Sequence, residues 1–179
     1  MAEDITELLH AWQAGDREAL AMPVVRDALR RAAALRLGGG QDAPSSPTGL
    51  VHEVLSRMLG GSADLASRAH LLALAALHMR TILVERARLA ATREPTAPRA
   101  GATGAPGEPA IGEHAFDVLM LERALQQLEQ HDERAARVVV MSCFGGMQRD
   151  EIAVAASIPA AAVDGDLRFA RAWLNRALA

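Results

Sequence analysis

Histidine and acidic side chains are the groups in this sequence that could bind a metal or move protons. His52 and Glu53 begin the pattern of a zinc protease helix, in which a second histidine follows the first by four residues. That position is Ser56, so the second ligand of such a site is missing. His70 and His78 lie eight residues apart in one expected helix, and no third ligand accompanies them. Because a zinc site needs several such ligands, we expect no metal and no cofactor.

Two further groups could support catalysis, and neither has the partners that it needs. Gly101, Gly104 and Gly107 lie in a proline-rich stretch, whereas phosphate loops lie between a strand and a helix. Cys143 is the single cysteine, which excludes an internal disulfide, and it has no evident base beside it. We therefore expect Cys143 to be a small buried residue and the protein not to be an enzyme.

The composition predicts an all-α fold. Half of the 179 residues are apolar, aromatic residues make up only 3%, and the apolar residues are mostly Ala and Leu, which favour helices. Valines and isoleucines do not form the alternating runs that are typical of strands. The chain thus has enough apolar material for a core that is built from helices alone.

Charge and hydropathy favour a cytoplasmic protein. The formal net charge is −3, which argues against a protein that coats nucleic acid but is compatible with a local basic surface. The first residues, Met1-Ala2-Glu3-Asp4, are acidic, whereas a signal peptide begins with basic residues. The most apolar stretch, residues 71–77, is far too short to cross a bilayer.

The chain divides into two small helical domains joined by a flexible linker. The first domain covers residues 1–91 and the second covers residues 113–179. Residues 92–112 are rich in Pro, Gly, Ala and Thr and contain no large apolar residue before Ile111, which is typical of a flexible linker.

Helical periods, capping residues and glycines predict where the helices begin and end. Asp16 and Ser67 are candidate N-caps, and Pro23 marks either a kink or the first turn of its helix. The expected helices span about 4–14, 16–37, 49–59, 67–89, 113–130, 132–144, 148–156 and 160–179.

The last part of the chain has the pattern of a helix-turn-helix. A short helix over 148–156, a turn over 157–159 and a longer helix from Ala160 onward follow one another. Its expected small core consists of Ile152, Ile158, Val163 and Leu167. The same spacing also fits two ordinary helices of a bundle.

Several strings of residues, in both domains, resemble one known family. They are Trp12-Gln13-Ala14-Gly15-Asp16 and residues 47–53, 68–70, 79–88, 121–125, 137–139, 144–146, 151–153 and 170–174. Their order and spacing resemble the extracytoplasmic-function (ECF) sigma factors of bacterial RNA polymerase over nearly the whole chain. The resemblance implies a protein without bond chemistry that binds core polymerase, places it on a promoter and helps to open the duplex.

The resemblance also implies which residues make these contacts. By position, the third helix docks on the polymerase, and its contact residues are Leu50, His52, Glu53, Val54 and Arg57. The fourth helix contacts the upstream edge of the melting region through Arg80, Arg86 and Arg88, which could form a basic strip or only a solvated helix face. The last helix enters the major groove. The charge pattern of residues 148–179 adds that Arg149, Arg168, Arg171 and Arg176 could hold phosphates. The implied partners are core RNA polymerase and promoter DNA, with an anti-sigma factor as a further candidate.

The expected recognition helix differs from the family pattern where base reading would be decided. Residues 160–162 are alanines, which can contact only a thymine methyl group. Asp164 and Asp166 would approach phosphates with the wrong sign, although early helix turns favour negative charge. Ser157 stands where the family commonly has Gly, which is costly if that position needs a positive φ. Gly165 costs its helix up to about 1 kcal/mol relative to Ala.

These observations leave three hypotheses. The first is an ECF-type sigma factor that directs polymerase to specific promoters. The second is a degenerate sigma-like regulatory protein that binds polymerase or a regulator and has weak or no sequence-specific DNA binding. It is favoured by the altered recognition helix and by the lack of the usual aromatics around His70. The third is a helix-turn-helix repressor that does not use polymerase, and the resemblance of the third helix argues against it.

Overall fold

The computed structural model describes residues 2–16, 18–19, 23–37, 47–61, 65–92 and 111–179. Within these ranges the chain forms eight helices and no strand, which confirms the predicted all-helical fold. The helices are α1 (Ala2–Gln13), α2 (Pro23–Leu37), α3 (Pro47–Leu59), α4 (Arg68–Thr92), α5 (Ile111–His131), α6 (Glu133–Cys143), α7 (Arg149–Ala156) and α8 (Ala160–Leu178). None of these helices combines the length and the apolar character that a bilayer span needs.

We call α1–α4 the N-terminal half and α5–α8 the C-terminal half. Most of the predicted linker, residues 93–110, lies outside the described residues, and residues 92, 111 and 112 belong to α4 and α5. The predicted domain boundaries therefore stay a prediction.

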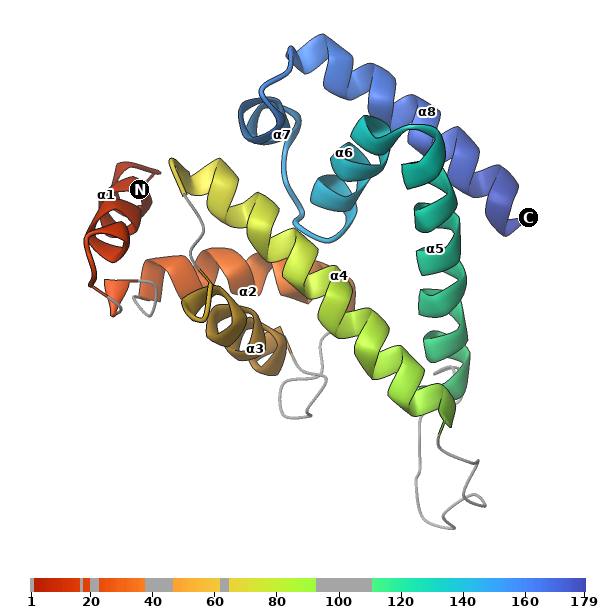
Figure 1. The fold of residues 1–179 in the computed structure, drawn as a ribbon, viewed down its shortest axis with the longest axis horizontal. Coiled ribbons are helices and arrows are strands. Elements are labelled where there is room, and N and C mark those ends of the chain that lie inside the picture. The colour runs from red at the N-terminus through yellow and green to blue at the C-terminus, as the bar shows by residue number, and fades with distance from the viewer. Residues whose placement is uncertain (1, 17, 20–22, 38–46, 62–64, 93–110) are drawn as a thin grey trace.

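The central element of the fold is α4. It runs between α1–α3 on one side and α5–α8 on the other (Figure 1) and packs against helices of both halves. Its sequence explains this position, because buried residues such as Leu71, Ala76 and Val84 lie on different sides of the helix. A helix that is apolar on most sides is stable only when neighbours cover those sides.

The buried side chains form one hydrophobic cluster that continues through both halves. Leu9 and Leu50 of the N-terminal half belong to it, as do Leu125 and Leu128 of α5, and all four are fully buried. The halves are thus joined by a shared core and not only by a surface contact.

The connection between α6 and α7 needs a glycine where it folds back over the last turn of α6 and lies against α4. A Cβ atom at Gly145 would lie 3.1 Å from the Cβ of Ala76 on α4 and 2.6 Å from the carbonyl oxygen of Met141. Real Cβ atoms do not tolerate the second distance. The absence of a side chain at Gly145 therefore lets this connection lie against α4.

The helix starts confirm one of the predicted capping residues and correct another. Ser67 precedes α4, and its Oγ accepts a hydrogen bond from the backbone N–H of His70 at 3.5 Å. Pro23 is the first residue of α2, where its fixed φ is suited to a first turn. The prediction that Asp16 caps this helix is wrong, since its carboxylate accepts from the N–H of Glu18 in a short turn before α2.

The segment from α7 to α8 packs around the apolar residues that the sequence predicted. Ile152 and Val163 are fully buried, and Ile158 and Leu167 are partly buried against them. The turn between the helices contains Ser157 with φ 54° and ψ 44°, the one non-glycine residue with a positive φ among those described. Ser157 therefore has the steric cost that was predicted for a non-glycine residue with a positive φ at this position.

Cys143 is the last residue of α6 and is exposed, so the prediction of a buried cysteine is wrong. The buried face of α6 is filled by larger residues of the same helix, among them Val138, Val139 and Met141. Cys143 follows them on the side that faces away from the core.

Candidate functional site

Four charged residues tie α3, the predicted polymerase-binding helix, to α4. The guanidinium of Arg57 donates to Glu85 Oε2 at 2.6 Å and to Glu53 Oε1 at 3.0 Å. Arg86 of α4 donates to the other oxygen of Glu53 at 2.7 Å. All four side chains are partly exposed, so this α3–α4 network fixes the helix and presents both signs of charge at the surface.

Three of the five residues assigned to the polymerase contact reach the surface. His52 is exposed, and Glu53 and Arg57 belong to the α3–α4 network. Leu50 and Val54 are fully buried, because positions 50 and 54 lie on the core-facing side of α3. In this structure they hold α3 in place, and a direct contact of their side chains with polymerase stays a prediction.

The α3–α4 network shifts the pKa of Arg57 and of Glu85. The hydrogen bond to Glu85 raises the pKa of Arg57, and desolvation opposes this only in part. The same hydrogen bond lowers the pKa of Glu85. Burial, assisted by the positive charge of Arg57, lowers the pKa of His78 on α4. The arrangement therefore favours a charged network beside a neutral His78.

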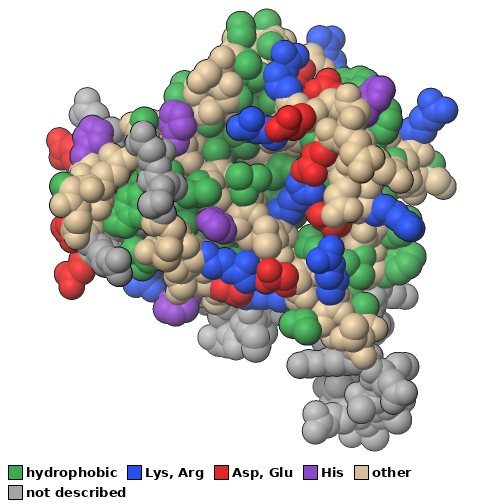
Figure 2. Space-filling view, viewed as in Figure 1, with side chains coloured by type: hydrophobic (Ala, Val, Ile, Leu, Met, Phe, Trp, Pro, Cys, Tyr) green, Lys and Arg blue, Asp and Glu red, His purple; other side chains and the backbone are tan. Residues whose placement is uncertain are grey.

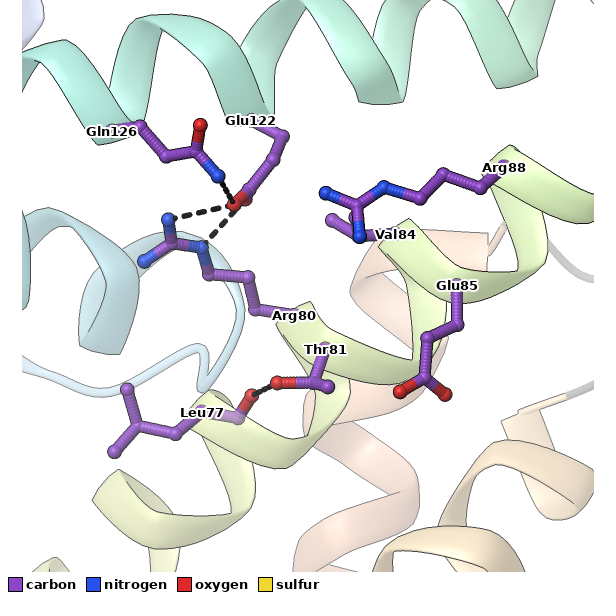
Figure 3. A pocket seen from close by; sticks show the side chains of 8 residues that line it. All are labelled: Leu77, Arg80, Thr81, Val84, Glu85, Arg88, Glu122 and Gln126. Atoms are coloured by element: carbon purple, nitrogen blue, oxygen red, sulfur yellow. Dashed lines mark hydrogen bonds and ion pairs between the residues drawn. The ribbon is translucent and has the colours of Figure 1, made fainter. Parts of the chain in front are cut away.

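Arg80 bridges the two halves. Its Nε and Nη2 donate to the two carboxylate oxygens of Glu122 on α5 at 2.8 and 3.1 Å, and its Nη1 donates to Glu129 (Figure 3 shows the bonds to Glu122). Gln126 donates a further hydrogen bond to Glu122 at 2.8 Å. Burial lowers the pKa of Arg80, but the hydrogen bonds outweigh this effect and leave it raised. The side chains of Arg80 and Glu122 are only 12% and 13% exposed.

A cleft of about 330 Å³ lies between α4 and α5 beside Arg80. Figure 3 shows Arg80 and Arg88 extending from α4 on the side of α5, whereas Glu85 points away from α5. Arg88 is exposed, Arg80 is paired with α5, and Arg86 is paired with Glu53. The three arginines predicted to contact DNA therefore do not form one open basic strip in this structure.

The predicted phosphate-binding arginines of α7 and α8 are exposed, and an acidic residue lies among them. Arg149 forms ion pairs with Asp164 at 3.2 Å and Asp150 at 3.3 Å. Arg168 donates to the backbone carbonyl oxygen of Asp164 at 3.3 Å, and Arg171 is exposed further along α8. The charge of Arg149 is thus partly balanced before any phosphate approaches.

Asp166 has a structural role that sequence reasoning missed. Its carboxylate accepts two hydrogen bonds from Arg134 of α6, at 2.8 and 2.9 Å, and its side chain is only 8% exposed. The expectation that Asp166 would approach phosphates is therefore wrong, since its charge is turned inward and paired. This bidentate ion pair connects α6 to α8.

The remaining surface is mixed in charge. On the face in Figure 2, Arg side chains (blue) and acidic side chains (red) lie next to one another over the middle of the molecule. Three rings that sequence analysis did not single out stack at the end of α5 and along α8: His131 lies 4.7 Å from Trp173 and 6.0 Å from Phe169, between ring centroids. The i, i+4 spacing of Phe169 and Trp173 was the available signal for this group.

Sequence reasoning also missed Glu122 and Glu129. Their spacing of seven residues places both on one side of α5, which was readable, but nothing local indicates that Arg80 lies opposite them. Within the described ranges, no group of three or more His, Cys, Asp or Glu residues could hold a metal ion. The arrangement offers charged surfaces for macromolecular contacts.

Comparisons with known proteins were made at the level of families, of curated proteins and of solved structures. The family model described as "ECF sigma factor" matches residues 2–179, a range that includes all eight helices. No curated protein and no solved structure matches the chain.

Proposed function

The chain belongs to the ECF sigma factor family, and from this premise we propose that it binds core RNA polymerase and directs transcription initiation at specific promoters. Members of this family are non-catalytic transcription regulators, so the protein is not an enzyme. The observation that carries the proposal is the family match over residues 2–179, which includes both the helix assigned to polymerase and the helix assigned to the promoter. We further propose that it acts in the cytoplasm, where the polymerase is, and that the chain divides into domains at residues 92–112.

For the polymerase contact we propose the exposed side of α3. His52 is exposed there, and the α3–α4 network holds Glu53 and Arg57 in fixed positions beside it. Fixed charges of both signs favour specificity of a protein interface more than raw affinity. Leu50 and Val54 support this surface from the core.

For promoter DNA we propose the exposed arginines of α4 and α8. Arg88, Arg168 and Arg171 are exposed, so their guanidinium groups can reach phosphates without a change of fold. Arg149 first has to leave Asp164, and Arg80 and Arg86 have to leave their carboxylate partners. An anti-sigma factor, which would compete for these surfaces, is a further partner in this proposal.

The experiment is a reconstitution with purified core polymerase. The complex is isolated, and promoter-dependent transcripts are measured from a genomic library. We expect both a stable complex and transcripts that start at a few shared sequences. Complex formation without such transcripts contradicts the sigma factor function, and absence of a complex contradicts the polymerase contact.

A pair of histidine variants tests the proposed surface. His52→Asp changes an exposed residue of α3, and His10→Asp makes the same change at an exposed residue of α1. We expect His52→Asp to weaken polymerase binding by about tenfold or more, as for a central interface residue, and His10→Asp to leave it unchanged. Equal affinities of the two variants would place the contact elsewhere.

One observation favours the degenerate regulator as the second candidate. The start of α8 has alanines at 160–162, and Asp164 lies beside Arg149, so this end of the helix has few donors for base edges. A salt titration of binding to duplex DNA separates the candidates. A promoter-reading protein prefers its own promoter over random duplex at every salt concentration, whereas the degenerate regulator binds both weakly, with the same shallow slope.

A further inference from the structure

We propose that Glu122 and Glu129 form a latch that holds the C-terminal half on α4 and hides Arg80 from nucleic acid until the halves separate. This inference rests on the proposed function, because it concerns a residue that is assigned to DNA. It goes beyond that function, since it describes how the free protein is kept from binding DNA through Arg80.

Arg80 lies between two carboxylates of α5. Three of its donor atoms are engaged by Glu122 and Glu129, and only 12% of its side chain is exposed. A phosphate cannot contact this guanidinium while α5 covers it. The residue that could hold DNA is therefore the same one that holds the C-terminal half.

Other contacts along α4 hold the two halves in the same closed arrangement. At the start of α4, Arg68 forms an ion pair with Glu151, whose other oxygen accepts from the backbone N–H of Gln148 and so caps α7. Between these ion pairs, Gly145 lies against Ala76. Besides the shared core, the halves therefore meet along α4 at these three places.

The shielded charge of Arg80 makes the closed arrangement depend on its two carboxylate partners. If the carboxylates are removed, the guanidinium of Arg80 is left without a partner in a poorly hydrated place, which is strongly unfavourable. This cost shifts the equilibrium toward separation, since separation returns Arg80 to water, while the exposure of the shared core opposes it. Phosphate groups of DNA can also take the place of the two carboxylates as hydrogen-bond partners of Arg80. Binding to DNA and opening are thus thermodynamically linked.

The experiment measures the distance between the halves in the full chain. Cys143 is exposed on α6, and Ser56→Cys adds a second exposed thiol on α3, so that two spin labels report the separation. We expect one narrow distance distribution at low salt. Glu122→Gln/Glu129→Gln is expected to broaden it and to shift it to longer distances, with the helical content unchanged.

A matched control removes the same charge from the same half. Asp117→Asn/Glu133→Gln neutralises two exposed acidic residues of α5 and α6. We expect this control to keep the narrow distribution. We expect the latch variant to bind mixed-sequence duplex DNA at least about tenfold more tightly than the control, because Arg80 adds to the phosphate contacts.

A second variant covers the case in which the latch variant does not fold. Arg80→Met/Glu122→Met replaces the ion pair by apolar side chains, which often preserves or increases stability. This variant is expected to stay closed when mixed-sequence duplex DNA is added, whereas the wild-type distances lengthen. An opening of both proteins to the same extent overturns the proposal.

The outcomes also separate this inference from the proposed function. Unchanged distances in a folded latch variant, or equal opening of the control, overturn the latch even if the protein binds polymerase. A failure of the wild-type protein to bind core polymerase contradicts the proposed function. The distance and duplex-DNA measurements still decide the latch in that case, because neither uses polymerase.

Discussion

Charged residues of the described chain are mostly engaged with one another, and this decides what each can do. Asp166 is the clearest example, since its buried carboxylate is held by Arg134. Asp164, two residues earlier on the same helix, is about half exposed and pairs with Arg149 at the surface. The two aspartates look equivalent in the sequence, but Asp166 stabilises the C-terminal half, whereas Asp164 balances part of the surface charge of Arg149.

This difference predicts opposite sensitivities to mutation. We expect Asp166→Ala to lower the free energy of unfolding by about 1–2 kcal/mol, because a buried, charge-assisted hydrogen-bonded contact is lost. Asp164→Ala is expected to change it by less than about 0.5 kcal/mol, as for most surface substitutions. Urea unfolding followed by circular dichroism measures both. Similar losses for the two variants would contradict the assigned roles.

His78 predicts a pH dependence of stability. Its pKa is lowered in the folded protein by burial and by Arg57, so the unfolded chain binds a proton more readily. Neutral His78 therefore contributes fully to the free energy of unfolding above the pKa that His78 has in the unfolded chain, about 6.5. This contribution is lost as the pH falls below that value. We expect the urea midpoint to fall less between pH 7.5 and pH 5.5 in His78→Gln than in the wild type. Equal changes in both proteins would exclude a role for His78.

At the scale of elements, two glycines near α7 and α8 are used in different ways. Gly145 lies where the connection after α6 touches α4, and a Cβ there would collide with backbone. Gly165 lies inside α8, and a Cβ there meets nothing within 4 Å. The first glycine is needed for packing, whereas the second only makes its helix less stable than it could be.

The same substitution at these two positions is therefore expected to have opposite effects. Gly165→Ala should raise the free energy of unfolding by up to about 1 kcal/mol, through helix propensity. Gly145→Ala should lower it by about 1–3 kcal/mol, because the added methyl group forces a backbone shift. Thermal unfolding of the two variants gives the sign directly. A stabilising Gly145→Ala would show that the added methyl group fits between Met141 and Ala76 without a backbone shift.

At the scale of the whole molecule, the shared core couples the stability of the two halves. Leu9 of α1 and Leu128 of α5 belong to one hydrophobic cluster, although the sequence between them contains the predicted linker. Because α4 takes part in the packing of both halves, neither half can lose its structure without exposing apolar surface of the other.

We therefore expect the wild-type protein to unfold at low salt in one cooperative transition. Leu9→Ala should lower the midpoint of that whole transition, with a cost of about 2–5 kcal/mol for the cavity. Scanning calorimetry tests this by comparing the calorimetric and van't Hoff enthalpies. If only part of the heat absorption moves to lower temperature, the halves unfold independently, and the shared core does not couple them.

Much of the local structure was determined by the sequence by itself. Ala- and Leu-rich periods, Ser67 before α4 and the glycines after α6 act within a few residues, so the helices and most of their ends could be predicted. The packing of Ile152 with Val163 could also be predicted, since a short turn leaves few other ways to bury both residues. The ECF sigma factor family was recognisable for the same reason, because its motifs are local strings in a fixed order.

Only the tertiary structure decided which charges meet. Arg80 and Glu122 are far apart in the sequence, as are Arg134 and Asp166, and their pairing depends on how helices pack against α4 and α6. Helical periodicity states which side of a helix a residue is on, but it does not state which helix lies opposite. For this reason sequence reasoning assigned Arg80 and Asp166 to the surface, whereas the fold pairs each of them with a partner and shields both from water.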